Sequence, residues 1–424
     1  MSPITPFNIA VPDAQLKQLR QKLEQTTLPD ELNDAGWGMG VPLADVKRLI
    51  TTWRDNFDWR AQEKKLNEQL CQFIVPVTVD GVGNMDIHVV HHRSRNPQAI
   101  PLLFIHGWPG SFLEATKLIP LLTKDDDGPS FDVVVPSLPN FGFSQGAHQK
   151  GFGLAQYAET LHKVMLALDY NEYVIQGGDW GSMIARTMSQ YYAAHTRAIH
   201  LNFIPVIPPY PWRSPFRFVQ SLGSVPFSAR DRAKVARTIG YVTTGNAYMK
   251  IMETKPQTIG YGLHDSPVAL LAWIYEKLHD WSDDYAWTDE EVLTWVSIYY
   301  FSRAGPAASG RIYYEASASK PERDTAADGE GSEGTIKNWM TLTQVLGVSA
   351  PNHVRFAVAE FKEEIIMWPM AWYRAIGNVV KEKEFDRGGH FAAWEVPELL
   401  VGDLKEFLGK EGPAYGAVTR RSGY

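Results

Sequence analysis

Cysteine is nearly absent from this sequence. Cys71 is the only cysteine among 424 residues, so no disulfide can form within the chain. Disulfides persist in oxidising compartments, and a chain of this length without one favours a reducing environment. We therefore expect a cytoplasmic protein, in which Cys71 is a small core residue.

Long apolar runs are also missing. No segment approaches the roughly 20 apolar residues that a membrane-spanning helix needs, and residues 1–20 lack the basic stretch and apolar run of a signal peptide. We expect a soluble protein without an integral membrane segment. Weak peripheral attachment through a surface patch stays open.

Basic clusters are absent too. Lys and Arg number 41 against 48 Asp and Glu, a net charge of −7 without a long basic run, which argues against a nucleic-acid partner. What the chain has in quantity is aromatic residues, with 14 Trp, 18 Tyr and 19 Phe. They indicate either core packing or an aromatic-lined pocket for an apolar small molecule.

The chain is too long for one ordinary hydrophobic core, and the pattern of apolar and polar residues changes along its length. We predict an α/β protein with a mostly parallel central sheet, flanked by helices, because short apolar runs alternate with amphipathic helical patterns. The predicted parts are a helical N-terminal extension (1–70), a first core part (71–205), an inserted helical lid (206–345) and a second core part (346–424).

Individual elements follow from periodicity and turn residues. Strands are expected at 73–79, 85–91, 101–105, 132–136, 173–176, 198–204, 354–359 and 379–385, and helices at 43–57, 59–70, 112–122, 154–168, 267–278 and 290–301. The polar stretch 316–336 is predicted to be a surface loop.

A glycine-rich turn follows the apolar run 173–176. In Gly177-Gly178-Asp179-Trp180-Gly181, glycines surround an acidic residue, and a helical pattern follows. This is the strand–turn–helix setting of a nucleophile elbow, which lifts the central side chain above the sheet edge. A glycine-rich turn capped by Asp179 is the structural alternative.

The central residue determines the chemistry. A carboxylate that attacks a saturated carbon forms an ester, which water can cleave, whereas a serine would form a stable ether. Asp179 at an elbow therefore indicates substitution at sp³ carbon, as in epoxide opening or dehalogenation.

A second turn, 106–110, follows the run 101–105. In this architecture the loop after that strand supplies an oxyanion donor, so we expect the backbone N–H groups of Trp108 and Trp180 to form the oxyanion hole. His106 comes too early in the chain to be the base, and we interpret it as structural. His390, after two glycines and the last predicted strand, has the chain order of a general base. Glu360, Glu363 and Glu364 are candidates for its orienting acid.

Together these motifs resemble the microsomal-type epoxide hydrolases, which have the α/β-hydrolase fold and a dedicated N-terminal domain. The resemblance covers nearly the whole chain and rests on Phe57-Asp58-Trp59-Arg60, 106–110, Gly177–Gly181, Thr254-Lys255-Pro256, Asp265-Ser266-Pro267 and 388–395. It implies Asp179 as nucleophile and His390 as base. It also implies Glu364 as the acid, although Lys362 replaces the usual proline and leaves Glu363 open.

The resemblance further implies two lid tyrosines that donate to the epoxide oxygen. They are Tyr248 and Tyr313, with Tyr314 an open neighbour of the second. Animal members of the family often carry a membrane anchor, which this sequence lacks, so we expect a soluble member.

The predicted reaction is hydrolysis of a small apolar epoxide by water, without a metal or organic cofactor. A haloalkane or haloacid dehalogenase is the alternative that uses the same Asp179. A non-catalytic binding protein on this fold is the alternative from another class. A homodimer is left open.

Overall fold

The computed structural model describes residues 3–124, 126–212, 215–317 and 341–424. Its centre is a nine-stranded mixed sheet in the order β1-β2-β3-β5-β4-β6-β7-β8-β9. The pairs from β5 to β9 are parallel, whereas β1, β2 and β3 join antiparallel. The strands are β1 (Thr5–Pro6), β2 (Gln72–Val79), β3 (Gly83–His92), β4 (Ile100–Ile105), β5 (Phe131–Pro136), β6 (Tyr173–Gly177), β7 (Thr196–Leu201), β8 (Arg355–Glu360) and β9 (Asn378–Glu384).

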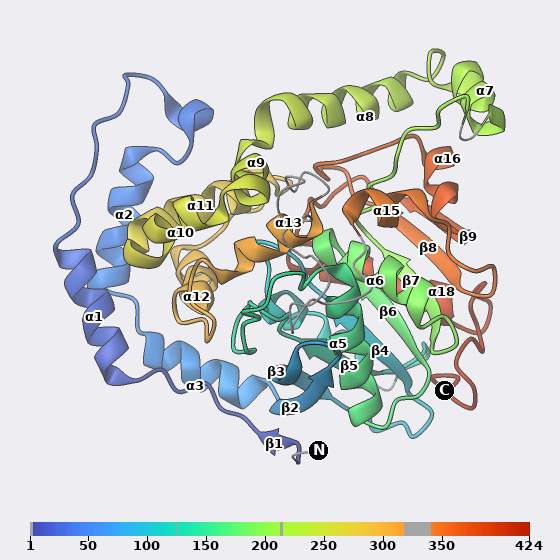
Figure 1. Ribbon diagram of the computed structural model, residues 1–424, viewed down its shortest axis with the longest axis horizontal. Coiled ribbons are helices and arrows are strands. Elements are labelled where there is room, and N and C mark those ends of the chain that lie inside the picture. Colours follow the sequence, from blue (N-terminus) through green and yellow to red (C-terminus); the bar gives the residue numbers. More distant parts are fainter. Residues whose placement is uncertain (1–2, 125, 213–214, 318–340) are drawn as a thin grey trace, which may run out of the picture.

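The middle of the sheet is buried on both faces. Every residue of β4, β5 and β6 is buried, which matches their mainly apolar sequence. Helices α5 and α6 pack against one another over the sheet, as Figure 1 shows. The helices of the core are α4 (Ile119–Leu122), α5 (Leu154–Ala167), α6 (Asp179–Tyr191), α16 (Met370–Tyr373), α17 (Ala392–Glu395) and α18 (Pro397–Leu408), with 3₁₀ turns η2 (Phe112–Ala115) and η5 (Arg374–Ile376).

One predicted helix, 112–122, was wrong. The segment forms the short turn η2 and then α4, with a break between them. Ser111 caps η2 by accepting a hydrogen bond from the Leu113 N–H at 3.2 Å. Pro120 has no N–H with which to continue a helix from η2, but it fits the first turn of α4.

Between β7 and β8 the chain leaves the sheet and forms a helical layer above one end of it (Figure 1). This layer agrees with the prediction of an inserted lid, although the domain limits themselves stay a proposal. Its described elements are α7 (Pro215–Ser224), α8 (Ala229–Gly240), the π-helical turn η3 (Tyr241–Gly245), α9 (Ala247–Thr254), α10 (Pro256–Asp265), α11 (Pro267–Asp280), α12 (Asp289–Tyr300), η4 (Ala308–Gly310), α13 (Arg311–Ala316) and α15 (Leu342–Gly347). Most of the predicted loop 316–336 lies outside the described residues.

The N-terminal helices pack outside this lid. They are α1 (Asp13–Glu24), η1 (Gly36–Met39), α2 (Leu43–Asp55) and α3 (Trp59–Gln69). Figure 1 shows α1 and α2 beside α10 and α11, and α2 also contacts α12. The N-terminal extension therefore packs its apolar face against the lid helices. The lid lies between this extension and the sheet.

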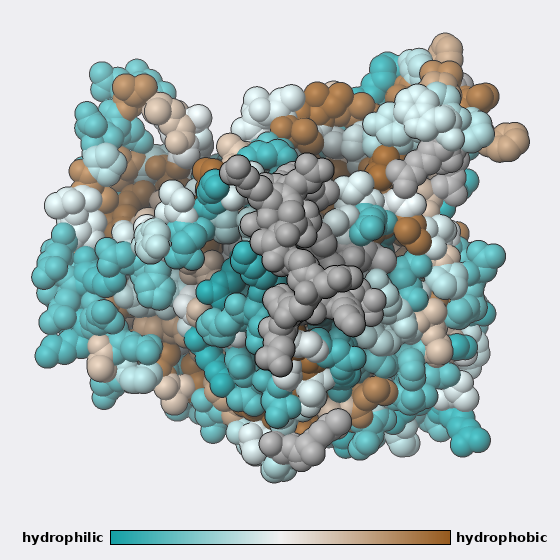
Figure 2. Space-filling view, viewed as in Figure 1, coloured by the Kyte–Doolittle hydropathy of each residue, from teal (hydrophilic) through white to brown (hydrophobic). Residues whose placement is uncertain are grey.

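The surface gives two further findings. Cys71 is exposed, so the expectation of a core residue was wrong. It lies just before β2 and is held there through its backbone: its N–H donates to His92 Nε2 at 3.0 Å, and its carbonyl oxygen accepts from the His91 N–H at 2.9 Å. Figure 2 shows a mainly hydrophilic face with apolar surface over α7 and α8, where Phe216 and Val219 are exposed. Within the described ranges, no helix combines the length and the apolar character needed to cross a membrane.

Candidate active site

Asp179 lies on a strained turn between β6 and α6. Its φ of +45° is in the left-handed region that favours glycine, and a non-glycine residue there requires strong support from its surroundings. The support comes from close packing of the turn against the strand β4: a Cβ at Gly181 would lie 1.9 Å from the Ile105 carbonyl oxygen. Only glycine permits this approach, so the turn presents Asp179 at the sheet edge.

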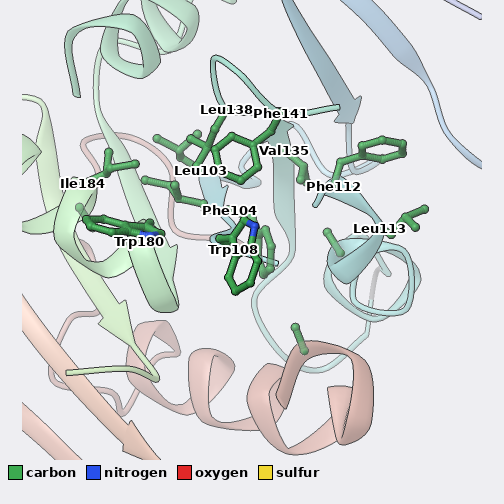
Figure 3. Close-up of a cluster of buried hydrophobic side chains, with 14 of the residues drawn as sticks. Leu103, Phe104, Trp108, Phe112, Leu113, Val135, Leu138, Phe141, Trp180 and Ile184 are labelled. Atoms are coloured by element: carbon green, nitrogen blue, oxygen red, sulfur yellow. The ribbon is translucent and has the colours of Figure 1, made fainter. Parts of the chain in front are cut away.

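The loop after β4 contacts the carboxylate of Asp179 directly. The backbone N–H of Trp108 donates to Asp179 Oδ1 at 2.7 Å, and a Cβ at Gly107 would lie 2.1 Å from the same oxygen. Figure 3 shows Trp108 from this loop and Trp180 from the start of α6 at the same end of the sheet. Among the described contacts, the Trp180 N–H makes no hydrogen bond to this carboxylate, so its role as the second oxyanion donor stays a prediction.

The same loop is tied to the lid. The Trp108–Pro109 peptide bond is cis. The carbonyl of Pro109 accepts a hydrogen bond from Trp295 Nε1 at 2.5 Å, and that of Gly110 accepts one from the Tyr299 hydroxyl at 2.6 Å. Both donors come from α12, so the lid helps to set the position of the Trp108 N–H.

His390 lies on the other side of Asp179. Its Nε2 is 3.5 Å from Asp179 Oδ2, and its Nδ1 is 2.6 Å from Glu364 Oε1. The Glu364 oxygen also accepts from the Ile365 N–H at 2.7 Å, which fixes the carboxylate in place. The side chains of His390 and Glu364 are only 3% and 2% exposed. The nucleophile, base and acid candidates thus form one chain of contacts, in which the base and the acid are buried.

The other two acid candidates point elsewhere. Glu363 forms an ion pair with Arg237, and Glu360 forms one with Lys234 and accepts from the Tyr373 hydroxyl at 2.5 Å. Glu364 is thus the carboxylate of the three that contacts the imidazole of His390. The departure from the family pattern at Lys362 does not alter this geometry, because Lys362 binds Asp283 on the surface.

Two neighbouring carboxylates control the protonation state of His390. Burial opposes its charged form, but the carboxylates of Glu364 and Asp179 raise the pKa of His390 well above its usual value. Esterification of Asp179 would remove one of these charges. The pKa of His390 would then fall, which makes the neutral, proton-accepting imidazole more accessible after ester formation than before it.

Tyr248 and Tyr313 face Asp179 from the lid helices α9 and α13. Both are buried, their ring centroids lie 6.0 Å apart, and the Tyr248 ring stacks on Trp108 at 5.1 Å. Burial, together with the charge of Asp179, raises the pKa of Tyr313 well above its usual value, so its phenol stays protonated at neutral pH. Tyr314 lines a different cavity, beside Lys150 and Phe152.

A cavity of about 80 Å³ opens between these tyrosines and Asp179. Its remaining lining is mainly apolar and comprises Trp180, Met183, Phe203, Pro205, Met249, Leu342, Leu346, Ile365 and Ile366, with the ring of Tyr241. An apolar cavity with two phenols above a carboxylate suits a small, apolar molecule that carries one hydrogen-bond acceptor.

Comparison with known proteins shows the family of this chain. A model described as the epoxide hydrolase N terminus matches residues 4–115, and one described as the alpha/beta hydrolase fold matches residues 100–287. Epoxide hydrolase 1 of Sus scrofa is 31% identical over 437 residues, covering 96% of this chain and 88% of that protein. The chain belongs to the epoxide hydrolase family.

Solved structures support the assignment over the full length of this epoxide hydrolase. The structure of Aspergillus niger epoxide hydrolase has a TM-score of 0.78 at 29% identity and covers 96% of each chain. Juvenile hormone epoxide hydrolase from the silkworm Bombyx mori has a TM-score of 0.81 at 25% identity, over 95% of this chain and 93% of that one. The predicted α/β-hydrolase fold and the predicted enzymatic activity, hydrolysis of an epoxide, are confirmed.

Some neighbours of the site in this epoxide hydrolase were not predicted. The Tyr241 hydroxyl lies 2.8 Å from that of Tyr248, and Glu114 lines a small cavity beside Asp179 and His390. Neither has a sequence signal, because one tyrosine of 18 and one glutamate in a loop look like packing and surface residues. His106 is buried, with Nε2 accepting from the Leu138 N–H at 3.2 Å, as a structural role requires.

Proposed function

We propose that this epoxide hydrolase opens its substrate through a covalent ester on Asp179. The carboxylate attacks one carbon of the epoxide ring, and the carbon–oxygen bond of that carbon breaks. Tyr248 and Tyr313 hold the ring oxygen, and one phenol gives it a proton as the bond breaks. The product of this step is a hydroxyalkyl ester on Asp179 and one tyrosinate.

Water completes the second step. His390, oriented by Glu364, takes a proton from water, and the resulting hydroxide attacks the ester carbonyl carbon of Asp179. The N–H groups of Trp108 and Trp180 stabilise the oxyanion. The ester bond then breaks, the imidazolium protonates the departing alkoxide, and a vicinal diol leaves. The remaining proton of the water returns to the tyrosinate, so the balance is one epoxide and one water to one diol.

One observation carries this proposal. The carboxylate of Asp179 lies between a lid that offers two buried phenols and a core that offers the His390–Glu364 pair, with Oδ1 already held by the Trp108 N–H at 2.7 Å. A dehalogenase has no use for two phenols above its nucleophile, because its leaving group is a halide that needs no proton.

Oxygen labelling tests the covalent step. A single turnover in H₂¹⁸O with enzyme in excess should yield unlabelled diol, because the new oxygen comes from Asp179. Repeated turnovers should introduce the label. In the variant His390→Gln the ester should accumulate and add the mass of the substrate to the intact protein. Label in the diol from the first turnover would exclude the ester.

The substrate class follows from the cavity. Its apolar lining supports an epoxide with an apolar substituent, and a screen over styrene oxide, long-chain and terpenoid epoxides would identify the preferred shape. We also propose a cytoplasmic location, which the single cysteine supports.

A further inference from the structure

A second, much smaller cavity lies on the histidine side of Asp179. Its volume is about 10 Å³, roughly the space that one water molecule requires. Asp179 is the only residue that lines both this cavity and the apolar one, within the described part of the chain. The carboxylate therefore separates an apolar side, suited to the epoxide, from a small polar side.

The polar side is lined by groups that can hold water. Gln176, at the end of β6, is 2% exposed, and its Nε2 donates to Asn202 Oδ1 at 2.7 Å. Its Oε1 is buried and has no hydrogen-bond partner within the described residues. An unpaired buried carbonyl costs roughly 1–3 kcal/mol, a cost that a bound water relieves. His390 lines the same cavity.

Glu114 supplies the remaining polar side chain. It comes from the turn η2, and its carboxyl crosses the loop that carries Trp108: a Cβ at Gly110 would lie 1.7 Å from Glu114 Oε1. Gly110 therefore leaves the space through which Glu114 reaches the cavity. Trp295 and Tyr299 of the lid hold the loop at Pro109 and Gly110. Glu114 lines the same cavity as Asp179 and His390.

The surroundings of Glu114 favour its neutral form. Burial raises the pKa of Glu114 to about 8; the charge of His390 lowers it, and that of Asp179 raises it. Burial and the charge of this carboxyl also raise the pKa of the neighbouring Tyr299. A neutral carboxyl can both donate and accept a hydrogen bond, as a water site between donors and acceptors requires.

We propose that Glu114 and Gln176 are positioning residues that hold the hydrolytic water in this cavity, against His390 Nε2 and the carbonyl carbon of the Asp179 ester. The inference rests on the proposed two-step mechanism and assigns its second step to this side of Asp179. The held water gives one proton to His390, and its oxygen bonds to the ester carbon. The bond between that carbon and the alkoxide oxygen then breaks.

The test separates the two chemical steps. Glu114→Met keeps the volume but removes the hydrogen bonds, whereas Glu114→Gln keeps a donor and an acceptor. With styrene oxide as the probe, ester formation is measured in a single turnover by tryptophan fluorescence, and the ester is quantified by intact mass after acid quenching. Glu159→Met removes a glutamate of α5 that lines neither cavity and is paired with Lys163, so it is the control for the loss of a carboxyl away from the site.

In Glu114→Met we expect ester hydrolysis to slow by about 10- to 100-fold, the effect of losing a hydrogen bond to the reacting water. Ester formation should stay within about threefold of wild type, so kcat and KM fall together while kcat/KM is preserved. Glu114→Gln should restore hydrolysis to within about threefold. Gln176→Met should reproduce the hydrolysis defect, which keeps the test available if Glu114→Met folds poorly.

Three results would overturn the inference: an unchanged hydrolysis rate in both methionine variants, an equal loss in both steps, or a Glu114→Gln variant as slow as Glu114→Met. Failure of the mechanism itself is recognised separately, because wild type and His390→Gln would then form no ester.

Discussion

Replacing Glu364 by Gln should remove a charge from the active site while leaving its geometry in place. Glu364 Oε1 accepts from both the Ile365 N–H and His390 Nδ1, so the amide oxygen of Gln can accept the same two hydrogen bonds. The other oxygen, Oε2, is buried without a partner in the described structure, and the amide NH₂ would take its place. The variant therefore isolates the electrostatic contribution of the carboxylate.

The size of the effect follows from distance and burial. Opposite charges about 4 Å apart interact by roughly 4 kcal/mol at an effective dielectric constant near 20. The 2.6 Å contact between side chains that are 3% and 2% exposed leaves little room for solvent screening. We expect the imidazolium to lose about 2–4 kcal/mol of stabilisation, which slows ester hydrolysis by roughly 30- to 1000-fold.

Glu363→Gln is the matched control. Glu363 lies next in the chain but binds Arg237 and is 30% exposed, so this variant should retain activity within about threefold. Both variants are assayed by acid-quenched single turnovers, with circular dichroism to verify folding. An active Glu364→Gln, or a Glu363→Gln that is equally slow, would refute the assignment of the acid.

Three further outcomes are expected. Tyr313→Phe should slow ester formation about 10²- to 10³-fold, the usual effect of losing one donor to a developing oxyanion, in single turnovers where Tyr314→Phe stays within about threefold. Gly107→Ala should reduce kcat/KM by at least about 100-fold, because the new Cβ would lie 2.1 Å from Asp179 Oδ1 and displace the nucleophile; near-normal activity would disprove this. Burial opposes the charge of Asp403, but His200 and Lys381 lower its pKa from 3.8 to about 2. The lowered pKa contributes about 2 kcal/mol to the free energy of unfolding above pH 4, and this contribution is lost as the pH falls toward 2. Urea unfolding of wild type and Asp403→Asn should therefore differ most above pH 4 and converge as the pH falls; a constant difference would contradict this.

The elements with a strong local pattern were predicted well. The central strands β4, β5 and β6 are mainly apolar, because a parallel sheet covered on both faces buries every residue. They lie within one residue of the predicted limits. The helix expected at 112–122 failed because periodicity does not register the missing N–H of Pro120. The exposure of Cys71 was missed because residue type predicts burial only on average.

The sequence alone was enough to predict the type of chemistry. An aspartate in a glycine turn, after a strand and before a helix, predicts a carboxylate nucleophile, because only glycine allows the close approach at Gly181 that the turn requires. Chain order likewise singled out His390. Such signals are local, since they depend on backbone conformation within a few residues.

Tertiary structure decided whatever depends on segments far apart in the chain. The choice among Glu360, Glu363 and Glu364 depends on which carboxylate meets His390, and Tyr313 differs from Tyr314 only in the direction of its side chain from α13. The separation of an apolar from a polar side of Asp179, with Glu114 on the polar side, exists only once β4, β6 and the lid are assembled. Distances between side chains on different elements are set by packing, and no spacing along the chain records them.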